Sequence, residues 1–594
     1  MRLPERSASI GFFAAGLLAL VGAGASGLSS ACYPAAGEGV DPPALSFYFP
    51  VGLAVSRGGN VLYAVNSDFD LQWNGGTIQS LDLHLIRRHT VIAIGDPTNP
   101  NLPLALPPDP DASCPSGPPV ITAVNDAGVV PGWACAPPTD ASFYMRDSAV
   151  IGAFATDLQL SVIDDPVNAG HSRIFSPVRG DASLTWAEVA DDDPSSPPNA
   201  TDTPASYAPF QLDCGTRDAH NRCDSLHHTG NNTSQPGDTR LVTMPGEPFG
   251  MAQADDGQSI VITHQTDVYS SLFSTFTPGT QGEIPAIQFV LSGVPTGGIG
   301  IASVPHDRAA FAPCYPLEDP PSDACNAVFP RPAFLQTSLS VAQVALIRYY
   351  SDIGTGPSSL YRPFITDEVN YPLNVPSGTT DFARGIAIDP TPRIRCMAQI
   401  TVPDTDPTFQ AQAMNCAQIP ARVFVASRAP PALLIGSVGQ MDAQGTYDAD
   451  LVTFTGSVSL GEQSTGPSTV KLAPIIDSQG NFHMEVFVVC FDSNQVLMYD
   501  PDQNPSQAQL IRMPVGLGPF ALAFDPFDFD AAARGDAAPA PTVDGDLQLR
   551  PYRFMYVGSF TNSYMQVVDL DLGHPDTFGT VVYNVGVPTA PKGS

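Results

Sequence analysis

A short β-type motif recurs along the chain and restricts the possible folds more than any other feature. Each copy opens with proline, glycine or alanine and continues into a strand of small apolar residues. The clearest copies are PVGLAVS from Pro50, PFGMAQA from Pro248, PTGGIGIAS from Pro295, ARGIAID from Ala383 and PFALAFD from Pro519. A second apolar strand, a polar turn and a third strand usually follow. Short apolar runs separated by turn residues predict small antiparallel sheets.

One such sheet cannot bury both of its faces alone, whereas several sheets stacked radially cover one another. The repeat therefore predicts an all-β fold, a β-propeller of about seven blades in a single domain over 50–588. Six or eight blades are also compatible, because insertions stretch the spacing. The units are predicted to begin near Pro50, Ala149, Pro248, Pro295, Phe382, Pro474 and Pro519.

The C-terminal sequence FGTVVYNVGVPTAP carries the same kind of lead-in as the stretches that start at Gly246, Gly293 and Gly516. A lead-in at that position has no following unit except the first one, at Pro50. We therefore expect the two ends of the domain to meet and close the ring, which would remove exposed sheet edges. Residues 589–594 form a short tail.

These repeats resemble the YVTN or lactonase-like family of β-propellers, whose units follow the pattern P-x-G-[IL]-A, then [LV]-Y-V, then V-x-[VL]-D. The segments FPVGLAVS, LYAVNSDFDLQWNGGTIQSLDL and RIFSPVRGDASLTWAEV also resemble exported propeller lipoproteins of myxobacteria. The resemblance implies the fold and export. It describes the fold more than any activity.

The N-terminal segment has the pattern of a secretion signal. Arg2 and Arg6 precede an apolar run at 10–25, and no later run is long enough to span a bilayer. Ala23-Gly24-Ala25 fits ordinary cleavage, whereas LSSAC, which ends at Cys32, resembles a lipobox. We favour a lipoprotein signal at 1–31, lipidation of Cys32 and a tether at 32–49. The expected location is the cell envelope, at the outer membrane or cell surface, with the periplasm or the medium as alternatives.

The ten cysteines support this interpretation. Eight of them form sequence-close couples in Pro- and Asp-rich stretches, and an exported chain can oxidise such couples. The predicted disulfides are Cys114 with Cys135, Cys214 with Cys223, Cys314 with Cys325, and Cys396 with Cys416. Cys490 lies in an apolar strand and is expected to be a buried free thiol. Loop insertions are predicted near 99–146, 191–240, 303–335, 391–420 and 530–548.

The net charge of −33 comes from 26 Lys and Arg against 59 Asp and Glu. Such a chain repels nucleic acid and anionic membranes, so we expect no nucleic-acid partner and membrane attachment only through a lipid. The expected form is a monomer. The partner is predicted to be a protein, a small molecule or a glycan.

Candidate binding residues come from the turns between the second and third strands. In four-stranded blades these turns open on the same ring face as the links between blades, around the central channel. The predicted ligand-binding residues on this face are Asn66, Asp68, Asp70, Arg179, Asp181, His264, Asp267, Arg428, Asp492, Asn494, Ser559 and Asn562. The competing interpretation is that the turns are polar because they are solvated.

The stretch Asn66 to Gly76 suggests a metal loop, because three oxygen-bearing side chains alternate at Asn66, Asp68 and Asp70. Leu71 stands where a calcium loop needs glycine, and no glutamate follows at the expected distance. Ca²⁺ bound by Asp68 and Asp70 is thus one hypothesis. Capping of a β-hairpin by Asx turns is the favoured one.

Two other motifs have simple alternatives. Arg179-Gly180-Asp181 matches an adhesion tripeptide that also arises by chance. The segment CGTRDAHNRCDSLHH, which begins at Cys214, could be a zinc knuckle, but the spacing of its cysteines favours a disulfide. The sequence contains no nucleophile elbow, no HExxH and no P-loop, and no catalytic residue is predicted.

Three functions remain open. The preferred hypothesis is a non-enzymatic binding or scaffold module on a lipid anchor. The second is a lactonase-like or related hydrolase with a divalent cation in the channel. The third is a cell-surface adhesin that acts through the cysteine-bearing loops.

Overall fold

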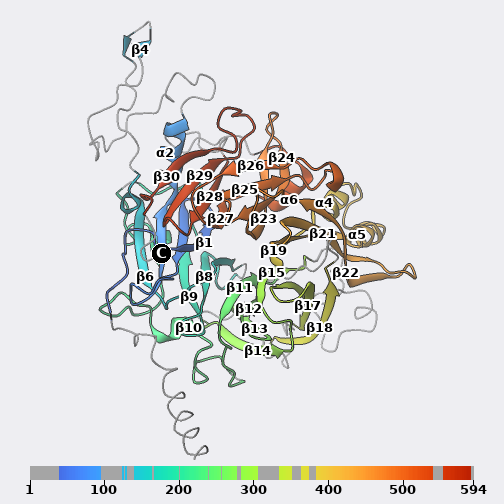
Figure 1. The fold of residues 1–594 in the computed structure, drawn as a ribbon, viewed down its shortest axis with the longest axis horizontal. Coiled ribbons are helices and arrows are strands. Elements are labelled where there is room, and N and C mark those ends of the chain that lie inside the picture. The colour runs from blue at the N-terminus through green and yellow to red at the C-terminus, as the bar shows by residue number, and fades with distance from the viewer. Residues whose placement is uncertain are drawn as a thin grey trace, which may run out of the picture.

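A computed structural model shows seven four-stranded antiparallel sheets arranged in a ring around one axis (Figure 1). It describes residues 39–94, 139–163, 166–199, 201–238, 240–255, 257–276, 283–305, 333–350, 363–373, 383–538 and 553–589, together with the two-residue strands β4 (Val124–Asn125) and β5 (Gly128–Val129). The predicted seven-bladed propeller is therefore confirmed.

Each blade is built from consecutive stretches of the chain, from the axis outwards in blades 1 to 7. Blade 1 consists of β1 (Pro50–Val55), β2 (Val61–Asn66), β3 (Thr77–Asp82) and β6 (Met145–Val150), and blade 2 consists of β7 (Gln159–Val162), β8 (His171–Val178), β9 (Ser183–Ala190) and β10 (His228–Thr229). Blade 3 consists of β11 (Pro248–Gln253), β12 (Ser259–His264), β13 (Tyr269–Ser274) and β14 (Ala286–Ser292), and blade 4 consists of β15 (Gly298–Ser303), β16 (Ala333–Ser338), β17 (Gln343–Tyr350) and β18 (Phe364–Pro372).

Blades 5 to 7 follow the same order. Blade 5 consists of β19 (Ala383–Asp389), β20 (Ala421–Ser427), β21 (Ala432–Met441) and β22 (Tyr447–Ser459). Blade 6 consists of β23 (Pro467–Ile476), β24 (Phe482–Cys490), β25 (Gln495–Tyr499) and β26 (Ile511–Pro514). Blade 7 consists of β27 (Pro519–Phe524), β28 (Phe554–Ser559), β29 (Tyr564–Asp569) and β30 (Val581–Val585).

Two predicted unit starts were wrong. Ala149 lies in β6, the outermost strand of blade 1, and the innermost strand of blade 2 follows only after Ala155. The link between the two strands contains Gly152 but no proline. Pro474 lies inside β23, which begins seven residues earlier at Pro467. The polar start of that strand, Ser468 and Thr469, hid its true beginning.

The ends of the domain meet as expected. β1 and β27 lie side by side, where the blue and red ends of the ribbon adjoin in Figure 1. The Gly586 amide donates to the Thr139 carbonyl at 2.7 Å, and the Phe49 amide donates to Ser563 Oγ at 3.1 Å. Among the described strands none is exchanged between blades, so packing and these links close the ring.

The core lies between neighbouring blades. Between blades 7 and 1, for example, Leu62, Ala64, Tyr556 and Val567 are all fully buried in one cluster. Each sheet is covered on both faces by its neighbours. This explains why second strands such as β2 are buried at every position and read as continuous apolar runs.

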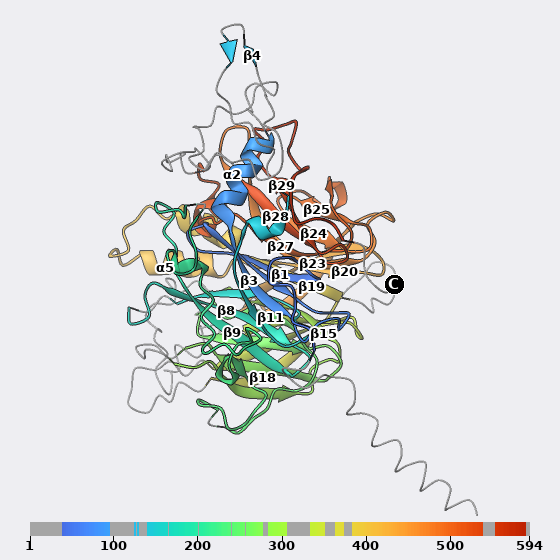
Figure 2. The same cartoon turned by 90° about the vertical axis from the view of Figure 1, so that its left-hand side faces the viewer.

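Short helices occupy the insertions. α2 (Leu83–Ile94) follows β3 and packs against β30 at the junction of blades 1 and 7, as Figure 2 shows from the side. α4 (Thr391–Ala398) and α5 (Phe409–Ala417) form the insertion of blade 5, and α6 (Phe529–Arg534) packs on α4. The single-turn 3₁₀ helices are η1 (Ala141–Phe143), η2 (Ala208–Phe210), η3 (Ser225–His227) and η5 (Pro505–Gln507). Among the described residues, no helix is both long and apolar enough to cross a membrane.

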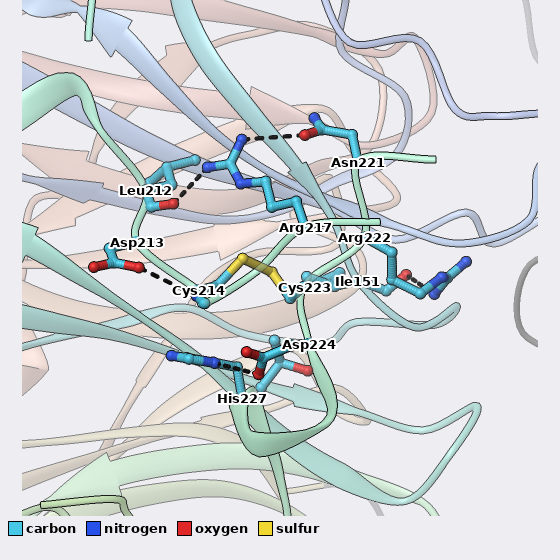
Figure 3. Close-up of a disulfide and its surroundings, with 12 residues drawn as sticks. Ile151, Leu212, Asp213, Cys214, Arg217, Asn221, Arg222, Cys223, Asp224 and His227 are labelled. Atoms are coloured by element: carbon cyan, nitrogen blue, oxygen red, sulfur yellow. Dashed lines mark hydrogen bonds and ion pairs between the residues drawn. A yellow bond between two sulfur atoms is a disulfide. The ribbon is translucent and has the colours of Figure 1, made fainter. Parts of the chain in front are cut away.

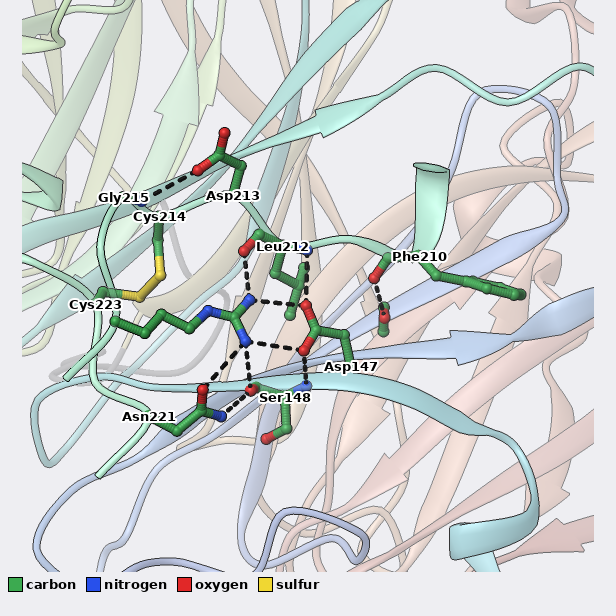
Figure 4. A network of polar contacts seen from close by, with 11 residues as sticks. Asp147, Ser148, Phe210, Leu212, Asp213, Cys214, Gly215, Asn221 and Cys223 are labelled. Atoms are coloured by element: carbon green, nitrogen blue, oxygen red, sulfur yellow. Dashed lines mark hydrogen bonds and ion pairs between the residues drawn. A yellow bond between two sulfur atoms is a disulfide. The ribbon is translucent and has the colours of Figure 1, made fainter. Parts of the chain in front are cut away.

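Two predicted disulfides are confirmed, Cys214–Cys223 and Cys396–Cys416. The first lies in the loop between β9 and β10 of blade 2, and this loop packs on blade 1 (Figure 3). There Asp147 of β6 accepts two hydrogen bonds from Arg217, at 2.9 and 2.7 Å (Figure 4). Because the two cysteines are bonded to each other, the zinc-knuckle hypothesis is wrong.

The remaining cysteines divide into two groups. Cys490 is a buried free thiol, as predicted. Cys32 and the couples Cys114–Cys135 and Cys314–Cys325 lie outside the described residues, so their predicted lipidation and pairing stay predictions.

Candidate functional site

The innermost strands of all seven blades line a cavity on the ring axis, with a volume of about 140 Å³. The lining residues stand near the start of each innermost strand, and the ring of matching positions includes Val51, Thr156, Phe249, Arg384 and Phe520. This arrangement follows from the repeat. In each blade other than blade 2, the first residue of the innermost strand pairs with the last residue of the second strand, and the lining residue comes directly after it. In blade 2 the bridge between Ala155 and Val178 takes the place of this pair, and Thr156 follows it.

Close approach of neighbouring strands explains the glycine of the motif. A Cβ on Gly250 would lie 1.9 Å from the carbonyl oxygen of Ile299, and a Cβ on Gly300 would lie 2.2 Å from that of Arg384. Both contacts are with the backbone of the next blade. Seven strands can thus surround a narrow axis only where such positions carry small side chains or none.

Threonine hydroxyls add links between blades at the same level. Thr263 Oγ1 accepts from the Gly250 amide at 2.9 Å and lies 3.3 Å from the Ile299 carbonyl oxygen of the next blade. Thr156 Oγ1 donates to the Phe249 carbonyl at 2.7 Å. The wall of the cavity is therefore held by hydrogen bonds across blades as well as by packing.

Arg384 lines the cavity, and its side chain has no hydrogen-bond or ion-pair partner among the residues that the structure describes. Within the described part of the chain, no hydrogen bond or ion pair reaches its guanidinium, and its Nε is buried. Burial lowers the pKa of Arg384, and the nearby Arg428 lowers it further, against the opposing effect of Asp492. A half-buried guanidinium without a hydrogen-bond partner is energetically unfavourable, and an anion that accepts its hydrogen bonds would stabilise it.

Two more ionisable side chains line the cavity, Asp157 from blade 2 and Lys471 from blade 6. Burial raises the pKa of the Asp157 carboxyl, and the charge of Lys471 opposes that rise. Blades 2 and 6 lie on different sides of the ring, so the two groups interact through the axis. The cavity thus carries two basic groups and one acidic group, in a chain whose net charge is −33.

The predicted site residues lie at the ring face where the innermost strands begin, since Pro50 pairs with Asn66 and Pro248 with His264. None of them belongs to the cavity lining. The lining residues Asp157, Arg384 and Lys471 were missed. The aligned lead-ins carried the signal for Arg384, because ARGIAID places it where PVGLAVS has Val51.

Several of the predicted residues make structural contacts. The Asn66 amide group donates to Thr77 Oγ1 at 3.0 Å and to Gln79 Oε1 at 2.7 Å. His264 is fully buried between the Gly246 carbonyl and Ser271 Oγ, both at 2.8 Å, and burial lowers its pKa. These side chains stabilise their own blades.

The charged turn residues are mostly paired. Arg428 forms an ion pair with Asp492 across blades 5 and 6, and Arg179 pairs with Glu247 across blades 2 and 3. Asp181 accepts from Ser183 Oγ at 2.6 Å. The adhesion tripeptide therefore has both of its charged side chains engaged within the fold.

The remaining predicted turn residues are Asp267, Asn494, Ser559 and Asn562. The carbonyl of Asn494 accepts from the Val515 amide and its side chain accepts from the Gly518 amide, both at 2.9 Å. Asn562 accepts through its carbonyl from the Thr589 amide. Both asparagines tie the turns to the links between blades.

Asp68 is fully buried and has a backbone φ of +49°. Its Oδ1 accepts from the Trp73 amide at 3.2 Å, as an Asx-type cap would, and Asp70 accepts from Gln72. Oδ2 of Asp68 accepts no hydrogen bond from the described residues, and burial raises the pKa of this carboxyl to about 7. The described residues contain no group of three or more His, Cys, Asp or Glu side chains that could hold a metal ion. The binding of Ca²⁺ by Asp68 and Asp70 stays a prediction.

Comparisons with known proteins add little to this site. No family model matches the chain, and no curated protein matches it. A putative 6-phosphogluconolactonase from Bacteroides uniformis is similar in structure, with 10% identity, a TM-score of 0.38, and coverage of 79% of this chain and 86% of that one.

Two other solved structures have similar values. Hydrazine synthase of Kuenenia stuttgartiensis has 9% identity, a TM-score of 0.38 and coverage of 90% and 99%. The periplasmic gluconolactonase of Pseudomonas aeruginosa has 11% identity, a TM-score of 0.36 and coverage of 79% and 86%. Likenesses this distant assign no activity, so the functional argument rests on the cavity itself.

Proposed function

We propose that this protein is a binding module whose central cavity takes up a small organic anion, with Arg384 as its main contact. The observation that carries the proposal is that Arg384 lines the cavity and that no hydrogen bond or ion pair within the described residues reaches its guanidinium. A carboxylate can accept two parallel hydrogen bonds from one guanidinium, and such bonds are stronger in a half-buried site than in water. The bound anion would replace the hydrogen bonds to water that the Arg384 guanidinium loses on burial.

The charge distribution supports an anion over a cation. Lys471 adds a second positive charge to the cavity, and protonation of Asp157, which a raised pKa favours, would leave the cavity positive. The rest of the chain is strongly acidic, so this is a local exception. A positive cavity surrounded by negative charge selects small anions and repels anionic macromolecules.

The test measures thermal unfolding with increasing acetate, succinate or phosphate. A ligand that binds only the folded state raises its stability by about 2.7 kcal/mol at a hundredfold excess over Kd. Arg384→Ala is expected to weaken binding about tenfold to a hundredfold, the usual value of a charge-assisted hydrogen bond. Arg384→Lys should retain part of it.

Arg534→Ala is the matched control, because it removes the same charge from an exposed side chain in the last turn of α6. Its binding should equal that of the wild type. An Arg384→Ala variant that is stabilised as much as the wild type by every anion would disprove the proposal.

A lactonase-like hydrolase is a second candidate, favoured by Asp157. A carboxyl whose pKa is raised by burial can serve as a general base near neutral pH. Asp157 would take a proton from water while the water oxygen adds to the lactone carbonyl, and Arg384 would stabilise the developing oxyanion. The ring C–O bond would then break, and the proton would pass from Asp157 to the departing ring oxygen, which leaves a hydroxy acid. Hydrolysis of aldonolactones above the uncatalysed rate, abolished in Asp157→Asn, would support this candidate; an uncatalysed rate in both proteins would eliminate it.

We also propose export with a lipid anchor at Cys32, which rests on the sequence alone. Cys32→Ala is expected to release the folded protein from the membrane fraction, since the described residues contain no helix that could cross a membrane. A variant that stays in that fraction would contradict the anchor without affecting the binding proposal.

A further inference from the structure

Six phenylalanines form a continuous band at the mouth of the cavity. We call it the aromatic crescent; it consists of Phe491 from blade 6, Phe520 and Phe560 from blade 7, Phe49 and Phe69 from blade 1, and Phe154 from the link into blade 2. Ring centroids lie 5.8 Å apart for Phe520 and Phe560, and 5.4 Å apart for Phe560 and Phe69. Phe154 follows at 6.0 Å from Phe69.

The crescent is partly open to solvent. Phe69 is 52% exposed, and the other five rings are half-buried rather than core residues. Leu71, Leu517 and Val587 are also exposed on the same ring face. Such a surface adds nothing to the solubility of an acidic chain, and contiguous exposed apolar surface commonly marks a binding site.

Phe520 joins the crescent to the cavity, because it belongs to both. The cavity therefore has an unpartnered cation on its blade 5 side and an aromatic wall on its blade 7 side that continues outwards. A ligand that satisfies both features has an anionic end for Arg384 and an apolar body that lies along the rings. Neither feature alone specifies this.

We propose that the ligand is a monocarboxylate with an extended apolar chain, bound with its carboxylate in the cavity and its chain on the aromatic crescent. The inference rests on the proposed function and narrows its ligand class. The cavity of about 140 Å³ suits the head group, and the four blades that the rings span suit a chain.

Two other occupants fit less well. A glycan needs polar partners around its hydroxyls, whereas all six side chains of the crescent are phenylalanine, without a hydroxyl or N–H. A lipid surface could cover the rings but would leave the Arg384 guanidinium in the cavity unpartnered. Both occupants are distinguished by the test.

The experiment titrates the full chain with acetate, butyrate, hexanoate and octanoate by calorimetry, below the concentration at which micelles form. Each added methylene is expected to tighten binding about twofold to fourfold, as burial of an apolar CH₂ group does. Octanol should bind much more weakly than octanoate. Arg384→Ala should reduce the affinity for every member of the series.

Phe69→Ala probes the crescent, and its partial exposure makes loss of the fold unexpected. The substitution should lower the affinity for octanoate about tenfold and leave the affinity for acetate unchanged. Phe364→Ala is the matched control, because that ring is also exposed, at 37%, but lies on the outermost strand of blade 4. Its affinity for octanoate should be that of the wild type.

Each alternative outcome has a distinct meaning. Anion binding that is independent of chain length would overturn the inference and leave the proposed function standing. Absence of binding for every anion would overturn both. Equal binding of octanol and octanoate, or binding to neutral lipid vesicles that octanoate does not displace, would show unspecific apolar docking and overturn the inference.

Discussion

The turns and the innermost strands lie at the same ring face, but they differ in whether their charged side chains form ion pairs. In the turns, Arg428 pairs with Asp492 and Arg179 with Glu247, each across the boundary between two blades. In the innermost strands, Arg384 has no partner within the described residues. The difference teaches that a polar turn serves the ring, whereas the lining of the axis is free to bind something else.

The two regions also differ in their tolerance of change. Turns end in solvent, so a side chain can be added there at little cost. The innermost strands approach one another so closely that the backbone of one blade touches the next. Three substitutions, ordered from the largest expected effect to the smallest, would test this contrast.

Gly250→Ala should have the largest effect. The new Cβ would meet the Ile299 carbonyl oxygen at 1.9 Å, so strands β11 and β15 must move apart. The free energy of unfolding is expected to fall by about 3 kcal/mol, the upper end of the usual cost of overpacking. Denaturant titration followed by tryptophan fluorescence measures it.

Gly246→Ala is the control for that variant. It lies in the link before the same strand, and the nearest atom to its Cβ would be Asp267 Oδ2 at 3.9 Å. Its stability should equal that of the wild type or exceed it by up to about 1 kcal/mol, because alanine restricts the unfolded chain. Equal losses in both variants would refute the contrast.

Asp68→Asn should have an intermediate, pH-dependent effect. The folded-state pKa of Asp68 is raised to about 7, so the folded protein holds a proton that the unfolded chain releases above about pH 4. Stability should therefore decrease between about pH 4 and pH 7, and the asparagine variant should lack this contribution. Asparagine keeps the acceptor for the Trp73 amide and tolerates the positive φ.

At pH 8 we expect Asp68→Asn to be more stable than the wild type by about 2 kcal/mol, roughly half of what the full pKa displacement corresponds to, because residual solvation reduces it. At pH 3, where both states of the wild type are protonated, the difference should vanish. Urea titrations at the two pH values measure it. A difference that is the same at both would mean that Asp68 does not titrate in this range.

Arg428→Ala should have the smallest effect. Both partners of its ion pair with Asp492 are 40% exposed, and pairs of this kind contribute between nothing and about 1 kcal/mol. A double-mutant cycle with Asp492→Ala should give a coupling energy of less than about 0.5 kcal/mol. A coupling above about 1.5 kcal/mol would place the turns among the rigid parts of the ring.

Most of the fold could be predicted from the sequence, because the same pattern of strand and turn residues occurs in several units of the chain. Proline lead-ins, small apolar strands and polar turns gave seven blades and the closure at Pro50. The two misplaced starts, Ala149 and Pro474, occur where the lead-in lacks proline, before β7, or is followed by polar residues, after Pro467. The pairs Cys214–Cys223 and Cys396–Cys416 were predictable because their partners lie close together in the sequence.

The candidate site was predicted less well. Turn residues such as Asn66 and His264 were selected for their polar groups, yet those groups satisfy buried partners in their own blades. Arg384 was visible only as one unusual residue in a strand motif. The aromatic crescent was not visible, because its six phenylalanines are spread over more than 500 residues of the sequence.

The sequence by itself determined the blade, since strand and turn propensities and apolar patterning act within about fifty residues of chain. It also determined the acidic charge. Only the tertiary structure decided which charge is unpaired at the axis and which rings meet at its mouth. The physical reason is that pairing depends on distances between blades, and the closure of the ring sets these distances.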